Sequence, residues 1–67
     1  MNKFPERLKE LRLENNLTRQ QLADKLKINA RTISYWELGQ RECNLDQLYA
    51  LALVLKTTTD YLIGLEN

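Results

Sequence analysis

The sequence predicts an all-α domain, a compact bundle of five short helices. Apolar residues recur at intervals of three and four, as they do on the buried side of an amphipathic helix. Threonine and asparagine, which favour helix N-caps, precede several of these stretches, and both glycines follow one. No stretch alternates apolar and polar residues with a period of two, so we expect no β-strand. The length of 67 residues suits a single domain, 1–67.

The first two helices are predicted at residues 5–15 and 19–26. Pro5 suits the first position of a helix, because the N–H group that it lacks would have no intrahelical partner there. Thr18 suits the N-cap of the second helix, and Gln21 follows at the distance that completes a capping box. The expected inward-facing residues are Phe4, Leu8 and Leu11 in the first helix and Leu22, Ala23 and Leu26 in the second.

The other three helices are predicted at residues 30–38, 45–55 and 59–63. The expected N-caps are Asn29, Asn44 and either Thr57 or Thr58, and the expected terminators are Gly39 and Gly64. The expected inward-facing residues are Ile33, Trp36, Leu45, Leu48, Leu51, Ala52 and Leu55. We interpret Trp36 as a core residue and not as a platform for stacking bases, because it follows Ile33 at helical spacing.

The second and third helices are joined by about three residues, 27–29, so they must cross at a steep angle. Close crossing needs a small side chain, which Ala23 supplies, and Ile28 is placed to fill the gap beside the turn. This pattern is typical of a helix-turn-helix. A generic helical hairpin can show the same pattern, so these spacings alone leave both interpretations open.

Charge is distributed unevenly, although the formal net charge is only +1. Residues 17–41 carry a net charge of +3, whereas residues 42–67 carry −3. A domain polarised in this way can present one positive face to a polyanion.

The composition excludes several classes of function. There is no histidine, the single cysteine (Cys43) is interpreted as a loop residue, and no carboxylate cluster or glycine-rich phosphate loop occurs. We therefore expect no enzymatic activity, no metal, no cofactor and no small-molecule substrate. No apolar run is long enough to span a bilayer and no signal-peptide pattern occurs, so we expect a cytoplasmic protein without membrane contact.

Three segments carry a wider resemblance, which extends from Phe4 to about Gly64. They are FPERLKELRLENNLTRQQLADKL, INARTISYWELGQR and NLDQLYALALVLKTTTDYL. Together they resemble the Cro and phage-repressor type of helix-turn-helix family, also called the XRE family. The resemblance implies a lambda-repressor-like fold of five helices whose third helix enters the major groove of double-stranded DNA. The family usually has glutamine at the position of Arg19 and glycine at that of Lys27.

The resemblance places four outward-facing side chains of the third helix against base edges: Ala30, Arg31, Ser34 and Tyr35. Arg31 is the sharpest candidate, because its planar guanidinium can bind O6 and N7 of guanine together. The methyl group of Ala30 suits an apolar contact with thymine. Two alternatives stay open. In one, Arg31 is only a solvated surface charge or a phosphate contact. In the other, the Tyr35 ring lies flat along the helix and simply covers it.

Backbone phosphates are expected on both sides of that helix. Thr18 and Arg19 stand at the start of the second helix, where free N–H groups and the helix dipole favour an anion. Asn29 and Thr32 can donate hydrogen bonds to phosphate oxygens, and Arg41 matches a basic position in the family's loop after the third helix. With so few cations, we expect weak non-specific binding, so tight binding requires a dimer.

Two charged residues, Arg12 and Glu37, lie on the inward side of their predicted helices. Arg12 follows Leu8 by four residues, and Glu37 follows Ile33 by four. An inward charge needs a partner, and the resembled family often pairs these positions in a partly buried salt bridge. We therefore expect a structural ion pair that fixes the first helix against the third.

A homodimer is expected because the fourth helix is unusually apolar. Ala50, Leu53 and Val54 add to its inward-facing residues, and an exposed apolar patch usually marks a contact surface. The expected dimer patch consists of Leu53, Thr57, Tyr61 and Leu65. Such a dimer would read a near-palindrome with its recognition helices about one DNA turn apart. We expect a repressor, since a small domain can block a promoter by occupancy.

The alternative is a protein-interaction module, such as an antitoxin-like partner that retains the helix-turn-helix fold. The apolar fourth helix favours it, whereas Arg31, Tyr35 and Arg41 beside an anion-ready helix start favour DNA. The interpretation of Leu53 as an isolated surface leucine, outside any contact surface, also stays open.

Overall fold

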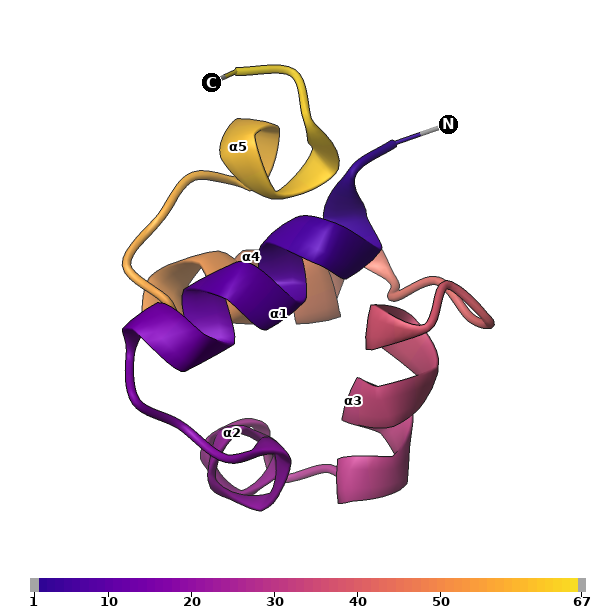
Figure 1. Ribbon diagram of the computed structural model, residues 1–67, viewed down its shortest axis with the longest axis vertical. Coiled ribbons are helices and arrows are strands. Elements are labelled where there is room, and N and C mark those ends of the chain that lie inside the picture. The colour runs from indigo at the N-terminus through magenta and orange to yellow at the C-terminus, as the bar shows by residue number, and fades with distance from the viewer. Residues whose placement is uncertain (1, 67) are drawn as a thin grey trace.

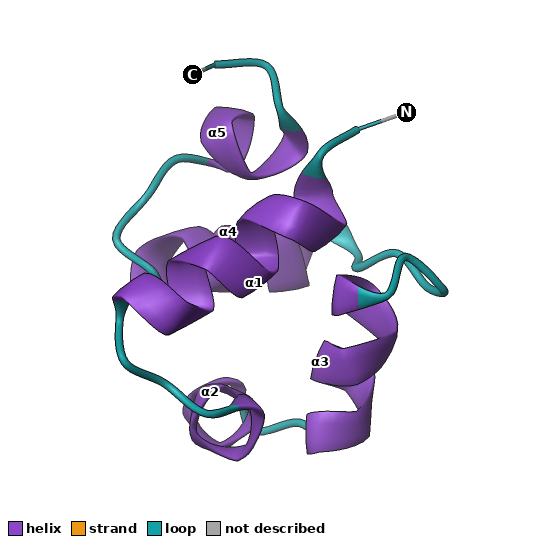
Figure 2. Cartoon of the chain, viewed as in Figure 1, coloured by secondary structure: helices purple, strands orange, loops and turns teal. Residues whose placement is uncertain are grey.

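The computed structural model describes residues 2–66 and contains five α-helices joined by short loops (Figure 1). The helices are α1 (Phe4–Glu14), α2 (Arg19–Leu26), α3 (Ala30–Glu37), α4 (Leu45–Val54) and α5 (Thr59–Ile63). Within this range there is no β-strand (Figure 2). The prediction of an all-α domain of five helices is therefore confirmed.

The helix α1 runs through the middle of the molecule, and the other helices are arranged around it (Figure 1). It packs against α3 and α5, while α2 packs against α3 and α4, and α4 also contacts α5. The pair formed by α2 and α3 lies at one end of the molecule, and α5 lies at the opposite end.

Polar side chains cap the N-termini of several helices. Thr18 Oγ1 accepts a hydrogen bond from the N–H of Gln21 (3.0 Å), and Gln21 Oε1 accepts one from the N–H of Thr18 (2.8 Å). The predicted capping box of α2 is thus confirmed. Thr58, and not Thr57, caps α5, because Thr58 Oγ1 accepts the N–H of Tyr61 (3.0 Å).

Several helix ends lie one residue from their expected positions. The last expected residues of α1, α3 and α4 are C-caps in the structure: Asn15, Leu38 and Leu55. Their φ angles lie between −90° and −88° and their ψ angles between −4° and 6°, which is the bridge region of backbone space. At the other end, α1 begins at Phe4, so Pro5 stands at its second position. The missing N–H is equally harmless there, because the first four N–H groups of a helix have no intrahelical acceptor.

Each of the five helices contributes a fully buried side chain to the core. The largest are Trp36, Leu8, Leu22, Ile33, Leu51, Leu55 and Leu62. The Trp36 ring meets that of Phe4 edge-on, with 6.2 Å between ring centroids, a favourable geometry for an aromatic pair. The interpretation of Trp36 as a core residue is confirmed, and it leaves no face for stacking a base.

The prediction that Leu45 faces inward is wrong. Leu45 is 83% exposed, although Ala52, which lies almost two full turns later on the same side of α4, is buried. Leu45 is the first residue of the helix, so the contrast places it at the margin of the packed core. Tyr49 and Leu53 follow Leu45 at four-residue steps and are also exposed, so the three form an inclined row along the helix surface. We call these three exposed residues the α4 stripe.

Candidate nucleic-acid interface

The turn between α2 and α3 consists of residues 27–29. Lys27 adopts the left-handed conformation (φ 58°, ψ 43°), and the N–H of Ile28 donates to the carbonyl of Ala23 (3.0 Å). Left-handed backbone costs a residue with a Cβ roughly 1 kcal/mol, which explains why glycine suits the position of Lys27. Ala23 is fully buried and Ile28 packs half-buried against the core. These contacts fix the angle at which α3 is presented.

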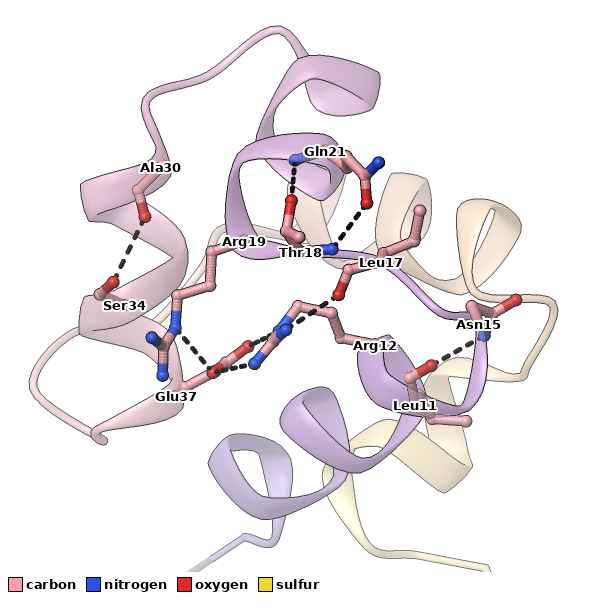
Figure 3. A network of polar contacts seen from close by, with 10 residues as sticks. All are labelled: Leu11, Arg12, Asn15, Leu17, Thr18, Arg19, Gln21, Ala30, Ser34 and Glu37. Atoms are coloured by element: carbon pink, nitrogen blue, oxygen red, sulfur yellow. Dashed lines mark hydrogen bonds and ion pairs between the residues drawn. The ribbon is translucent and has the colours of Figure 1, made fainter.

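The outer face of α3 carries the four predicted base-reading residues Ala30, Arg31, Ser34 and Tyr35. Arg31 is exposed and the other three are half-buried. Asn29 Oδ1 accepts the N–H of Arg31 (2.8 Å) and so caps the helix, while Thr32 is half-buried. Ser34 Oγ lies 3.5 Å from the Ala30 carbonyl, a distance too long for a strong hydrogen bond (Figure 3). Within residues 2–66, no hydrogen bond or ion pair engages the Arg31 guanidinium.

The structure brings Arg41 and Tyr35 together, a contact that the sequence did not predict. Gly39 has a positive φ of 73°, and the N–H of Gln40 donates to the carbonyl of Tyr35 (2.9 Å). The chain therefore turns back, and Arg41 Cζ lies 4.5 Å from the Tyr35 ring centroid. This cation–π contact is worth roughly 0.5–1 kcal/mol at an exposed site. One face of the Tyr35 ring is thus occupied by the predicted phosphate-binding arginine.

Arg12 and Glu37 join α1 to α3 through a buried ion pair (Figure 3). Arg12 Nε donates to Glu37 Oε2 at 2.7 Å, and Arg12 Nη2 donates to Glu37 Oε1 at 3.3 Å. Arg12 Nη1 donates to the carbonyl of Leu17 (2.9 Å). The side chains of Arg12 and Glu37 are only 8% and 1% exposed. Both inward charges are therefore paired and hydrogen-bonded, as burial requires.

Arg19 adds a second arginine to the same carboxylate. Its Nε donates to Glu37 Oε1 at 3.1 Å, and its side chain is 44% exposed (Figure 3). The sequence predicts Arg19 at the start of α2 but gives no sign of this contact with Glu37. Helical spacing relates residues within one element, so no spacing rule connects the first turn of α2 with the last turn of α3. The other predicted phosphate contact on α2, Thr18, is exposed.

The predicted dimer patch lies on α4, α5 and the residues that join and follow them. Leu53 and Leu65 are exposed, whereas Thr57 and Tyr61 are half-buried. Tyr61 is also held within the chain, because its hydroxyl donates to Glu10 Oε1 (2.7 Å) and Arg7 Cζ lies 4.1 Å from its ring centroid. The hydrogen bond to the Glu10 carboxylate raises the pKa of the Tyr61 phenol. Tyr61 thus fastens α5 to α1 in addition to lining the patch.

Residues 2–66 offer few groups suited to other kinds of site. This part of the chain has no cluster of histidine, cysteine or acidic side chains that could hold a metal ion. Cys43 lies half-buried in the loop before α4, where burial raises the pKa of its thiol. None of the described helices combines the length and the apolar character needed to cross a bilayer.

Comparison with known proteins places the chain in a family. The model of the helix-turn-helix family matches residues 8–62. Similar proteins include the HTH-type transcriptional activator BcrR from Enterococcus faecalis, 36% identical over 64 residues. Another is the uncharacterized HTH-type transcriptional regulator YqaE from Bacillus subtilis, 38% identical over 64 residues. Both alignments cover 96% of this chain, but the chain spans only 31% of BcrR and 55% of YqaE.

Solved structures show the same fold. A transcriptional regulator from Listeria innocua superposes with a TM-score of 0.90 at 28% identity, covering 100% of this chain and 63% of that one. The restriction-modification controller protein C.AhdI from Aeromonas hydrophila superposes with a TM-score of 0.82 at 32% identity, covering 90% of this chain and 91% of that one. The chain therefore belongs to the helix-turn-helix family of the Cro and phage-repressor (XRE) type, a family of DNA-binding transcriptional regulators.

Proposed function

We propose that the protein is a cytoplasmic, sequence-specific regulator that binds a near-palindromic operator in double-stranded DNA as a homodimer and represses transcription. The outer face of α3 carries this proposal. Arg31 is exposed there, with Arg41 beyond the end of the helix and Arg19 at the start of the neighbouring α2. A helix with a free guanidinium on its first turn, flanked by two further cations, suits a major groove lined by phosphates.

Base reading is assigned to the first two turns of α3. Arg31 would bind O6 and N7 of a guanine, a contact worth roughly 1–3 kcal/mol of discrimination. Ala30 would contact a thymine methyl group, and the Ser34 hydroxyl, which lacks a strong intramolecular partner, would bind a base edge or a water molecule. The hydroxyl edge of Tyr35 would reach a base while Arg41 covers the ring face.

Phosphate binding is assigned to residues on both sides of α3: Thr18, Arg19, Asn29, Thr32 and Arg41. Three of them offer hydrogen-bond donors without charge, and two offer guanidinium groups. Each cation that neutralises a phosphate adds about −0.9 to the slope of log affinity against log salt. Two arginines in one half-site therefore give a shallow slope for a single copy and twice that slope for a dimer.

The dimer is assigned to the patch of Leu53, Thr57, Tyr61 and Leu65. Leu53 belongs to both this patch and the α4 stripe, where Tyr49 and Leu45 are exposed at four-residue steps before it, so Leu53 is not an isolated surface leucine. Apolar surface that is exposed in a monomer is stabilised when a second copy covers it. A two-fold axis through this patch would lie away from the α2–α3 pair, which leaves both recognition helices free to face one DNA duplex.

The test is selection from a randomised pool of DNA duplexes at two salt concentrations, followed by sequencing of the bound fraction. Enrichment of a near-palindrome that weakens with salt supports the proposal and gives the operator. A reporter gene behind that operator then separates repression, which lowers its transcription, from activation. Salt-sensitive binding without enrichment would reduce the protein to a non-specific DNA binder.

A protein-interaction module is the second candidate, because the α4 stripe leaves three large apolar side chains exposed. It predicts no DNA binding at either salt concentration. The same selection therefore distinguishes it from the main proposal.

A further inference from the structure

The carboxylate of Glu37 serves two arginines at once. Oε2 and Oε1 both accept hydrogen bonds from Arg12, and Oε1 also accepts a hydrogen bond from the Nε–H of Arg19. The Glu37 side chain is 1% exposed, so it is fixed by packing as well as by Arg12. A rigid, buried acceptor holds whatever it binds in one orientation.

Arg19 is held by only one edge of its guanidinium. Its Nε–H points to Glu37, and within the described chain no hydrogen bond occupies its Nη1 or Nη2 groups. Figure 3 shows these two nitrogens on the side of the Glu37 carboxylate that faces away from Arg12. The free edge offers two parallel N–H groups, the geometry that binds two oxygens of one phosphate.

We propose that Glu37 is a positioning residue for DNA binding, which orients Arg19 so that its Nη groups clamp one backbone phosphate. This inference rests on the proposed function. Arg12 neutralises the carboxylate, so the positive charge of Arg19 remains available to the phosphate. Glutamine, which the resembled family usually has at the position of Arg19, would carry neither the charge nor the two-edged guanidinium.

Glu37→Gln distinguishes a positioning role of Glu37 from a simple effect of net charge, because the two predict opposite changes in DNA affinity. Removing a carboxylate beside a polyanion raises affinity if only net charge matters. If Glu37 orients Arg19, Glu37→Gln lowers affinity, because the neutral amide holds the guanidinium less firmly. The effect must also vanish once Arg19 is gone.

The experiment is a double-mutant cycle on binding to a random-sequence duplex pool, measured over a range of salt concentrations. Such a pool reports phosphate contacts and needs no operator. We expect Arg19→Gln to lower affinity about tenfold and to reduce the salt slope by about 0.9 per bound copy. Glu37→Gln lowers affinity similarly in the wild-type background and changes it less than about twofold in the Arg19→Gln background. Lys25→Gln, an exposed cation on the same helix, is the matched control and has a smaller effect.

Glu37→Gln leaves Arg12 without a charged partner, so thermal melting must show that the variant is folded. If Glu37→Gln does not fold, Arg19→Lys tests the proposal instead, because it keeps the positive charge and leaves the Arg12–Glu37 pair intact. A lysine ammonium has no planar edges, so it cannot donate to Glu37 on one side and present two parallel N–H groups to a phosphate on another. We therefore expect the affinity of Arg19→Lys for DNA to be well below wild type. Wild-type affinity in Arg19→Lys, or higher affinity in a folded Glu37→Gln variant, overturns the proposal. Absence of any DNA binding by the wild-type protein contradicts the proposed function instead, and is seen before any variant is made.

Discussion

At the scale of single residues, the backbone of Lys27 stores strain inside the helix-turn-helix. Its φ of 58° is a conformation that glycine adopts without the steric cost of a Cβ. We expect Lys27→Gly to raise the free energy of unfolding by roughly 0.5–1 kcal/mol, after the greater flexibility of glycine in the unfolded chain is deducted. Urea denaturation measures it. Lys27→Ala is the control, since it removes the charge but keeps the Cβ; an equal gain in both variants would assign the effect to charge.

Tyr35 has two proposed roles that a pair of substitutions can separate. Its hydroxyl is assigned to a base, and its ring supports Arg41 at 4.5 Å. We expect Tyr35→Phe to weaken selectivity at one base pair and to leave the salt dependence of DNA binding unchanged. Tyr35→Ala should also lower the salt dependence, because Arg41 loses its support. Identical salt slopes in the two variants would mean that the ring does not position Arg41.

At the scale of helices, the Arg12–Glu37 pair determines how α1 meets α3. Arg12→Ala leaves the Glu37 carboxylate buried with only the more exposed Arg19, so we expect a loss of roughly 3–5 kcal/mol in stability. That is a large share of the total for a small domain. Sequence preference in the remaining folded protein should change little. Lys9→Ala, an exposed cation on the same helix, is the control; a wild-type melting temperature for Arg12→Ala would refute a structural role.

The helices were predictable from the sequence to the extent that their signals are local. Thr18 and Gln21 form the capping box that their spacing predicts, since a capping box involves only residues of one turn. Leu45 was misplaced because its spacing from Leu48 and Ala52 fits the inner face, whereas spacing does not show that the first residue of α4 lies at the margin of the core.

The candidate site was less predictable because its decisive contacts join different elements. Arg19 meets Glu37 only after α2 and α3 have packed, and Arg41 meets Tyr35 only after the chain reverses at Gly39. These distances depend on tertiary packing, which periodicity and capping rules do not describe. The family resemblance identified the residue positions, and the structure supplies their contacts.

At the scale of the whole molecule, the proposed dimer would determine how tightly the protein binds DNA. We expect the wild-type protein to sediment as a dimer at micromolar concentrations and Leu53→Glu to shift it toward monomer, because the charge must be desolvated in the interface. Leu13→Glu is the matched control: Leu13 is 55% exposed and Leu53 63%, but Leu13 lies on α1 outside the patch. A wild-type protein that is strictly monomeric at high micromolar concentration rules out this dimer.

Arg31, on the outer face of α3, is the residue proposed to read DNA sequence. The most direct measurement is parallel selection from a randomised duplex pool with wild-type protein and Arg31→Ala, with Lys25→Ala as a folded control for the loss of a cation. We predict that Arg31→Ala loses selectivity for one G·C pair in each half-site, at a cost of roughly 1–3 kcal/mol, while the other positions keep their preferences. An unchanged set of preferences in Arg31→Ala, with binding weakened equally for all sequences, would contradict the claim and make Arg31 a phosphate contact.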